Sequence, residues 1–253
     1  MNTLFSLAAM SAASIVVPGT ATAAVIFERA TGATNIVVRV DGGRTDVSSI
    51  NDAITAPGTL SIVDAASRIG TSSTARAASS IIAEFTSSAS ATIAFDQATG
   101  YTGPGTAVAV AVGVLFYDFV LTTRSDILLN GTVATSGEDA VPLGQRIGIT
   151  GSGGAALFDS GRIAGPFAST VTLGAGRYSM FVGDLTTNVV GNDPDDALGA
   201  STGKTLNSRY SIAITDAATV PEPASWALMI AGFGMVGGAI RRRASVRIRG
   251  AAL

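Results

Sequence analysis

The chain of 253 residues contains no cysteine and no histidine. Without cysteine it has neither a disulfide framework nor a thiolate site. Without histidine it lacks Ser-His-Asp catalysis, histidine-ligated metal sites and the usual general base. No catalytic motif replaces these groups. The sequence therefore predicts a protein that is not an enzyme and that uses no cofactor other than, at most, a calcium ion.

Tryptophan and lysine each occur once, as Trp226 and Lys204, and only 13% of the residues are charged. The 16 basic and 18 acidic residues give a net charge of −2, and several arginines lie near the C-terminus, so the rest of the chain is more acidic than the whole. Nucleic acid is therefore not a predicted partner, because its phosphates attract basic surfaces. The scarcity of aromatic side chains also argues against strong stacking on sugars.

Carboxylates remain as candidate general acids and bases. A pair of them supports catalysis in glycosidases, so a secreted enzyme of unknown class stays open as an alternative. Nothing in the spacing of the acidic residues selects a pair. The candidates are Asp118, Asp126, Glu138 and Asp159.

Near the C-terminus, Pro221-Glu222-Pro223 precedes an apolar run from Trp226 to Ile240, and a block of arginines ends that run. At ~1.5 Å per residue the run covers roughly 22 Å, less than a typical ~30 Å bilayer core, but the arginine stems extend its reach. We predict a transmembrane helix within residues 220–243 and a basic cytoplasmic tail over 244–253. A buried helix of a soluble domain is the alternative.

The N-terminus predicts a secretory signal peptide over residues 1–23. Leu4–Val17 is apolar, Pro18-Gly19 breaks the run, and Ala21 and Ala23 form an A-x-A cleavage signature before Ala24. Residues 1–3 contain no lysine or arginine, which is unusual for a signal peptide. Both ends predict the same topology: the signal peptide directs the middle of the chain to the outside of the membrane, and the arginines retain the C-terminal tail in the cytoplasm.

The C-terminal segment resembles the PEP-CTERM sorting signal of Gram-negative bacteria, in the variant with Trp-Ala after the Pro-Glu-Pro. The residues that carry the resemblance most directly are Pro221, Glu222, Pro223, Trp226, Arg241, Arg242 and Arg243. The resemblance implies recognition and cleavage by a membrane transpeptidase of the exosortase type. It also implies an inner-membrane-anchored intermediate, a final place at the cell surface or in the extracellular matrix, and a link to extracellular polysaccharide.

The exported part, residues 24–219, is predicted to be one all-β domain with a β-sandwich or jelly-roll-like fold, because short β-branched runs alternate with turn signals. Thr106–Phe116 has two apolar faces, typical of a central strand covered on both sides, and a buried helix is the competing interpretation. Ala65–Ala89 is predicted to form a short helix or a loose connector. Asn130-Gly131 and Gly174-Ala175-Gly176 are turn signals. The remaining predicted strands are Ile36–Val40, Thr59–Val63, Ala91–Phe95, Tyr117–Thr122, Asp126–Val133, Arg146–Thr150, Val171–Leu173, Arg177–Val182 and Arg209–Ile214.

Three aspartates, Asp193, Asp195 and Asp196, lie together in the segment Gly191–Asp196. Calcium takes several oxygen ligands from such segments, so the sequence offers a calcium site. The alternative is a solvated acidic turn.

For the exported domain the first hypothesis is a structural or adhesive protein of the cell surface or matrix. The second is a carbohydrate-binding module. Tyr117–Asp184 loosely resembles extracellular β-sandwich modules of the carbohydrate-binding or pre-peptidase kind, a resemblance that bears on the fold more than on the ligand. Its supporting pieces are Phe119–Thr122, Leu157–Ser160 and the step from Leu173 to Tyr178.

Overall fold

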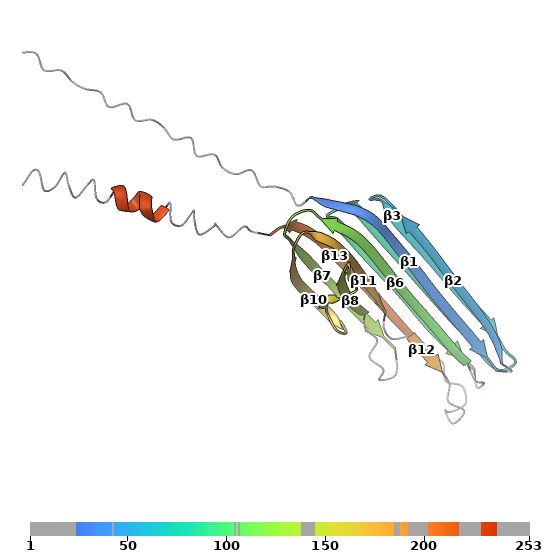
Figure 1. Ribbon diagram of the computed structural model, residues 1–253. Coiled ribbons are helices and arrows are strands. Elements are labelled where there is room, and N and C mark those ends of the chain that lie inside the picture. Colours follow the sequence, from blue (N-terminus) through green and yellow to red (C-terminus); the bar gives the residue numbers. More distant parts are fainter. Residues whose placement is uncertain are drawn as a thin grey trace, which may run out of the picture. The chain divides into compact units, whose positions relative to one another are not determined.

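A computed structural model describes residues 24–41, 43–103, 105, 107–137, 145–184, 188–191, 202–217 and 229–236. Residues up to Asp216 form one compact unit, built from strands that run antiparallel to their neighbours (Figure 1). The strands are β1 (Val25–Val40), β2 (Arg44–Ile54), β3 (Thr59–Ile69), β4 (Thr74–Ser87), β5 (Ser90–Thr102), β6 (Ala107–Leu121), β7 (Ser125–Ser136), β8 (Gln145–Gly151), β9 (Ala156–Asp159), β10 (Gly165–Leu173), β11 (Gly176–Asp184), β12 (Asn188–Gly191) and β13 (Thr202–Asp216).

Two sheets pack face to face. Sheet A has the strand order β2-β1-β6-β11-β8-β9, with β12 also paired to β6, and sheet B has the order β10-β7-β13-β5-β4-β3. Buried side chains from both sheets meet between them. The all-β prediction is thus confirmed, and the architecture is a two-sheet sandwich.

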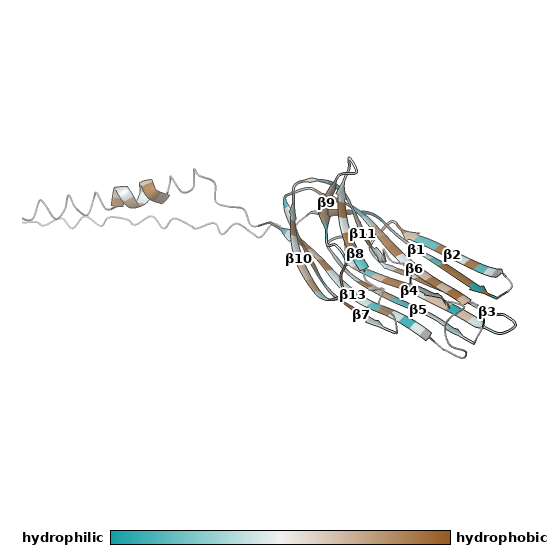
Figure 2. Ribbon diagram, turned by 90° about the horizontal axis from the view of Figure 1, so that it is seen from below, coloured by the Kyte–Doolittle hydropathy of each residue, from teal (hydrophilic) through white to brown (hydrophobic). Residues whose placement is uncertain are grey.

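Strand β6 is one continuous strand, whereas the sequence predicted two, one ending at Phe116 and the other beginning at Tyr117. Its alternating burial over Ala107–Leu121 rules out the buried-helix alternative. Tyr117, Phe119 and Leu121 point into the core, as predicted. The expectation that both faces are covered is wrong, because the valines at 108, 110, 112 and 114 lie half-buried on the outer face while small residues fill the inner one. Figure 2 shows the apolar stretch along β6 and its neighbour β1.

The segment Ala65–Ala89 is neither a helix nor a loose connector. It contains the end of β3 and all of β4, which pair in register from Thr59↔Glu84 to Ile69↔Thr74. Alanine and serine are weak strand formers, but here they alternate between a buried and an outer face. Close packing of small side chains in the core overrides their intrinsic preference.

Asn130-Gly131 is not a turn but lies inside β7, where Gly131 is opposite Tyr210 of β13. A β-carbon at position 131 would overlap the Tyr210 ring and lie 2.5 Å from the Arg209 carbonyl oxygen. The glycine therefore makes room for an aromatic ring on the neighbouring strand. The other turn signal is confirmed, since Gly174 and Ala175 connect β10 to β11.

The core contains two apolar clusters. A row of buried polar side chains, which runs across neighbouring strands, separates one cluster from the other along the strand direction. On sheet B, Asp64, Ser79 and Gln97 occupy one row across β3, β4 and β5. Asp64 accepts hydrogen bonds from Thr34 Oγ1 (3.2 Å) and Ser48 Oγ (2.7 Å) of sheet A. Another hydrogen bond between the sheets runs from Ser208 Oγ to Gln145 Oε1 (2.6 Å). These bonds fix the two sheets against each other, because a buried polar group without its partner is costly.

Asp41 lies in the connection that follows β1, and it contacts the connection between β3 and β4 and the one between β5 and β6. Its carboxylate accepts hydrogen bonds from the Thr71, Ser72 and Ser73 hydroxyls and from Ser72 N (3.0 Å), all between β3 and β4. Gly105, between β5 and β6, has no room for a β-carbon because Ser72 Oγ and the Asp41 carboxylate occupy the space. The Ser73, Thr71 and Ser72 hydroxyls hold the pKa of Asp41 far below its usual value.

We expect Asp41→Asn to lower the melting temperature at pH 7 by a few degrees, because the hydroxyl donors lose a charged acceptor. A carboxyl pKa that is lower in the folded state stabilises the fold above the unfolded pKa, near 4, and loses that effect as the pH falls toward the folded value. The difference between wild type and variant should therefore be full at pH 7 and shrink below about pH 4. Thermal unfolding of both proteins from pH 7 to pH 2 measures it. Asp52→Asn on the exposed strand β2 is the control, and a pH-independent difference for Asp41→Asn would contradict the assignment.

Candidate functional site

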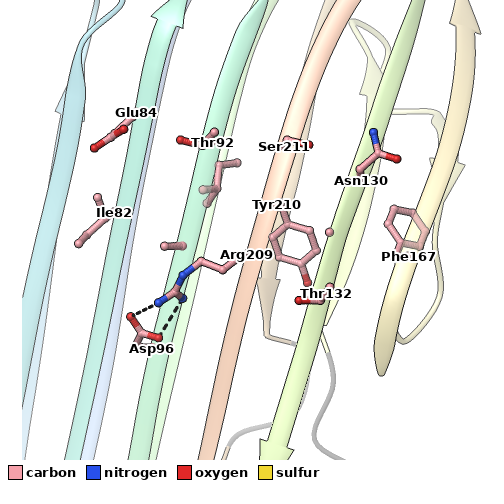
Figure 3. Close-up of a pocket in the computed structure, with 13 residues that line it drawn as sticks. Ile82, Glu84, Thr92, Asp96, Asn130, Thr132, Phe167, Arg209, Tyr210 and Ser211 are labelled. Carbon is pink, nitrogen blue, oxygen red and sulfur yellow. Dashed lines mark hydrogen bonds and ion pairs between the residues drawn. The ribbon is translucent and has the colours of Figure 1, made fainter.

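A shallow groove of about 720 Å³ lies on the outer face of sheet B and crosses five strands, from β4 to β10 (Figure 3). Its outward side chains come from residues two apart on each strand, which places them on one face of the sheet. Most of them are hydroxyl, amide or charged groups. They are Glu84 of β4, Thr92 and Asp96 of β5, Arg209 and Ser211 of β13, and Asn130 and Thr132 of β7.

An ion pair forms the centre of the groove. Arg209 Nη1 and Nη2 donate to Asp96 Oδ1 (2.9 Å) and Oδ2 (3.1 Å), and Nη1 also donates to the backbone oxygens of Phe95 (3.3 Å) and Ser208 (2.8 Å). Both side chains remain exposed, at 58% for Arg209 and 41% for Asp96. These contacts fix the guanidinium on the sheet while leaving it accessible to solvent.

Cross-strand register brings the other polar groups beside this pair. Arg209 is opposite Ala94 on one side and Thr132 on the other, and the next row contains Thr92, Ser211 and Asn130. These polar groups share the groove with apolar ones, which include Ala94 and the exposed Ile82. Such a surface suits a neutral, hydroxyl-rich or amide-rich ligand that exchanges many hydrogen bonds.

The groove offers no aromatic platform on its outer face. Tyr210 is 3% exposed and Tyr101 and Tyr117 are buried in the core, while Phe167, at the β10 end, packs against the apolar cluster. Recognition here would rest on hydrogen bonds rather than on ring stacking, in line with the scarcity of aromatic residues in the sequence.

The carboxylates that the sequence offered for catalysis do not come together. Asp118 pairs with Arg29 (3.3 Å) on the outer face of sheet A, and Asp159 pairs with Arg146 near the β9 edge of that sheet. Asp126 accepts a hydrogen bond from Thr172 Oγ1 (2.5 Å) on sheet B. Glu138 lies outside the described residues. Arg146 lowers the pKa of Asp159 and Asp159 raises that of Arg146, so this pair is held in its charged form.

The residues predicted for processing and for calcium lie outside the described part of the chain. They are Ala21 and Ala23 of the signal peptide, Asp193, Asp195 and Asp196 of the acidic segment, and Pro221, Glu222, Pro223, Trp226, Arg241, Arg242 and Arg243 of the sorting segment. Among the residues that the structure does describe, no group of three or more acidic residues is placed to hold a metal ion.

Residues 229–236 form a helix inside the predicted apolar run. Its large apolar side chains are exposed, from 51% at Met229 to 73% at Met235. Over the described ranges, no helix reaches the length and hydropathy required to span a bilayer. The rest of the predicted transmembrane helix lies outside the described residues.

Sequence reasoning missed the groove residues Asp96 and Arg209. They are 113 positions apart and meet only because β13 pairs with β5 in one particular register. The sequence does show alternating polar residues at Thr92, Asn130 and Thr132, but this pattern predicts a solvated face and not a common site. Strand register was the missing information.

Comparison with known protein families identifies one segment of the chain. Residues 219–243 match the family described as the PEP-CTERM protein-sorting motif. The motif supports sorting by an exosortase system, with export and a membrane-anchored intermediate. The match leaves residues 24–218 unassigned, and no curated protein matches the chain.

Proposed function

We propose that this exported protein acts at the cell surface or in the extracellular matrix as an adhesive protein, and that it binds polysaccharide in the groove of sheet B. The sorting motif supports the location. The observation that carries the binding role is the exposed Asp96–Arg209 pair within a broad array of hydroxyl and amide groups. Sugars present closely spaced hydroxyls, which such an array can match with charge-assisted hydrogen bonds.

Two other roles fit less of the geometry. A purely structural protein needs no array of polar groups in a groove, although the lack of an aromatic platform in this groove favours it over a strongly stacking module. A glycoside hydrolase needs two carboxylates across one substrate bond. Here Asp96 is bound to Arg209, Asp118 is paired with Arg29 on sheet A, and Asp126 accepts a hydrogen bond from Thr172.

A polysaccharide array probed with the full-length protein in mild detergent tests the proposal, with and without millimolar calcium. Arg209→Ala should weaken binding roughly 10- to 100-fold, because a hydrogen bond to a charged group contributes about 1.5–3 kcal/mol. Folding should survive, since an exposed ion pair contributes little to stability. The calcium arm also tests the predicted site at Asp193, Asp195 and Asp196.

Arg177→Ala provides a matched control. Arg177 is also an exposed arginine in an ion pair, with Glu28 (2.6 Å), but it belongs to β11 of sheet A. Its loss should leave polysaccharide binding unchanged. Equal affinities for wild type and Arg209→Ala, or the absence of binding by the wild type, would contradict a binding role for the groove and favour the purely structural one.

A further inference from the structure

Strand β3 ends sheet B and is long for an edge strand. It spans Thr59–Ile69 and pairs with β4 along its whole length. Across the described ranges, no strand is hydrogen-bonded to its other edge. Half of its backbone N–H and C=O groups therefore point away from the sheet, where another strand can pair with them.

The remaining edges of the sandwich carry features that discourage pairing. Strands β9 and β12 are only four residues long. Strand β10 contains Pro166, which lacks an N–H. On β2, an antiparallel self-pairing centred on the midpoint Ser49 would oppose Asp46 to Asp52 and so bring like charges together.

Strand β3 instead has exposed apolar side chains. Val63 is 68% exposed and Ile69 is 75% exposed, and both lie on the outer face of sheet B. They are the two most exposed large apolar residues of the described sandwich. Burial of each against another side chain would remove apolar surface from water.

The sequence of β3 is complementary to itself around Ala66. An antiparallel pair of two copies centred there opposes Val63 to Ile69 of the second copy, and Ile69 to Val63. On the inner face it opposes Asp64 to Arg68, and Arg68 to Asp64. Cross-strand aliphatic pairs and opposite charges each favour pairing.

Neighbouring registers lose this match. Centring the pair on Asp64 opposes Asp64 to its own copy, and centring it on Arg68 opposes Arg68 to its own copy. Centring it on Ala65 leaves Arg68 opposite Ile62 and Asp64 opposite Ala66. Only the register on Ala66 satisfies the apolar and the charged pairs together.

We propose that β3 pairs antiparallel with β3 of a second copy, in register on Ala66, and that the two six-stranded sheets B become one continuous sheet. The two-fold axis of such a pair stands perpendicular to the sheet, so outward residues oppose outward residues. Both grooves then open on the same face. The dimer does not depend on the groove binding polysaccharide, but it would make any such binding bivalent and raise avidity without new contacts.

A single-cysteine experiment tests the register, because the natural chain contains no cysteine. In Ala66→Cys the two thiols are directly opposed, with β-carbons ~4.5–5.5 Å apart, within reach of a disulfide. In Ser61→Cys the thiols are offset by ten residues, or roughly 33 Å. Mild oxidation of the full-length protein in detergent should cross-link most of Ala66→Cys and almost none of Ser61→Cys, as seen on a non-reducing gel.

Introducing charged side chains at the two exposed apolar positions of the outer face supplies a second test that leaves the core untouched. The double variant Val63→Lys/Ile69→Lys opposes lysines at two places and should be monomeric by light scattering, at concentrations where the wild type is a dimer. The double variant Val63→Lys/Ile69→Glu opposes lysine to glutamate and should restore the dimer. A monomeric wild type up to about 100 µM, or equal cross-linking of the two cysteine variants, would overturn the proposal. Cross-linking and light scattering are both measured without polysaccharide, so their outcomes are independent of the groove experiment.

Discussion

Replacement of Pro221-Glu222-Pro223 by three alanines is expected to abolish C-terminal processing and to leave the full-length chain in the inner membrane. The sorting motif covers residues 219–243 and places these three residues at its start. An exosortase-type enzyme would recognise the Pro-Glu-Pro sequence, in which proline fixes φ and removes a backbone N–H donor. Without this recognition sequence, the apolar run and the arginine block should remain attached.

Mass spectrometry of the C-terminal peptide and fractionation of the cell envelope measure this effect. The wild-type exported protein should end near Pro221–Pro223, and the triple-alanine variant should retain Arg241–Arg243. Pro57→Ala, in the exposed connection between β2 and β3, serves as a control for the loss of a proline elsewhere. Exported wild-type protein that still contains the arginine block would contradict processing at this site.

The sequence predicted the location of most strands because burial leaves a period of two along the chain. Tyr117–Leu121 shows this clearly, since Tyr117, Phe119 and Leu121 face the core and Asp118 faces outward, as expected. The same logic misjudged Val108–Val114. Alternating valine and small residues give no sign of which set faces the core, and here the small residues do.

Local propensity failed where tertiary contacts decide the structure. Ala65–Ala89 has the composition of a helix or a connector, yet it becomes β3 and β4 because small side chains suit the closely packed sandwich. Asn130-Gly131 has the composition of a hairpin turn, yet Gly131 serves to accommodate Tyr210, 79 positions along the chain. Neither contact can be deduced before the strand order is known.

The groove could not be predicted for the same reason. Its central pair joins Asp96 to Arg209, and each residue alone is an ordinary charge on the outer face of a strand. The sorting motif is the opposite case. Its residues are consecutive, so their order in the sequence was sufficient to identify it.

Two phenylalanines of β6 provide a direct test of the fold, because they differ only in the face that they occupy. Phe119 is fully buried, and its ring lies 4.9 Å from that of Tyr117 and 5.8 Å from that of Tyr178. Phe116 is 43% exposed on the outer face of sheet A, and the centroid of its ring lies 5.5 Å from that of the Phe181 ring. The same substitution at both positions therefore separates burial from residue type.

Phe119→Ala should lower the free energy of unfolding by about 3–5 kcal/mol, since it removes a buried ring and leaves a cavity among the core aromatics. That loss is a large part of the ~5–15 kcal/mol that stabilises a typical domain, and it corresponds to a fall in melting temperature of roughly 6–20 °C. Phe116→Ala should cost about 1 kcal/mol, the contribution of an exposed aromatic pair. Chemical denaturation of both variants measures the difference. Equal losses would show that the faces of β6 are not the ones described, whereas a much larger loss at position 119 than at position 116 follows directly from a sandwich whose core lies on that side of the strand.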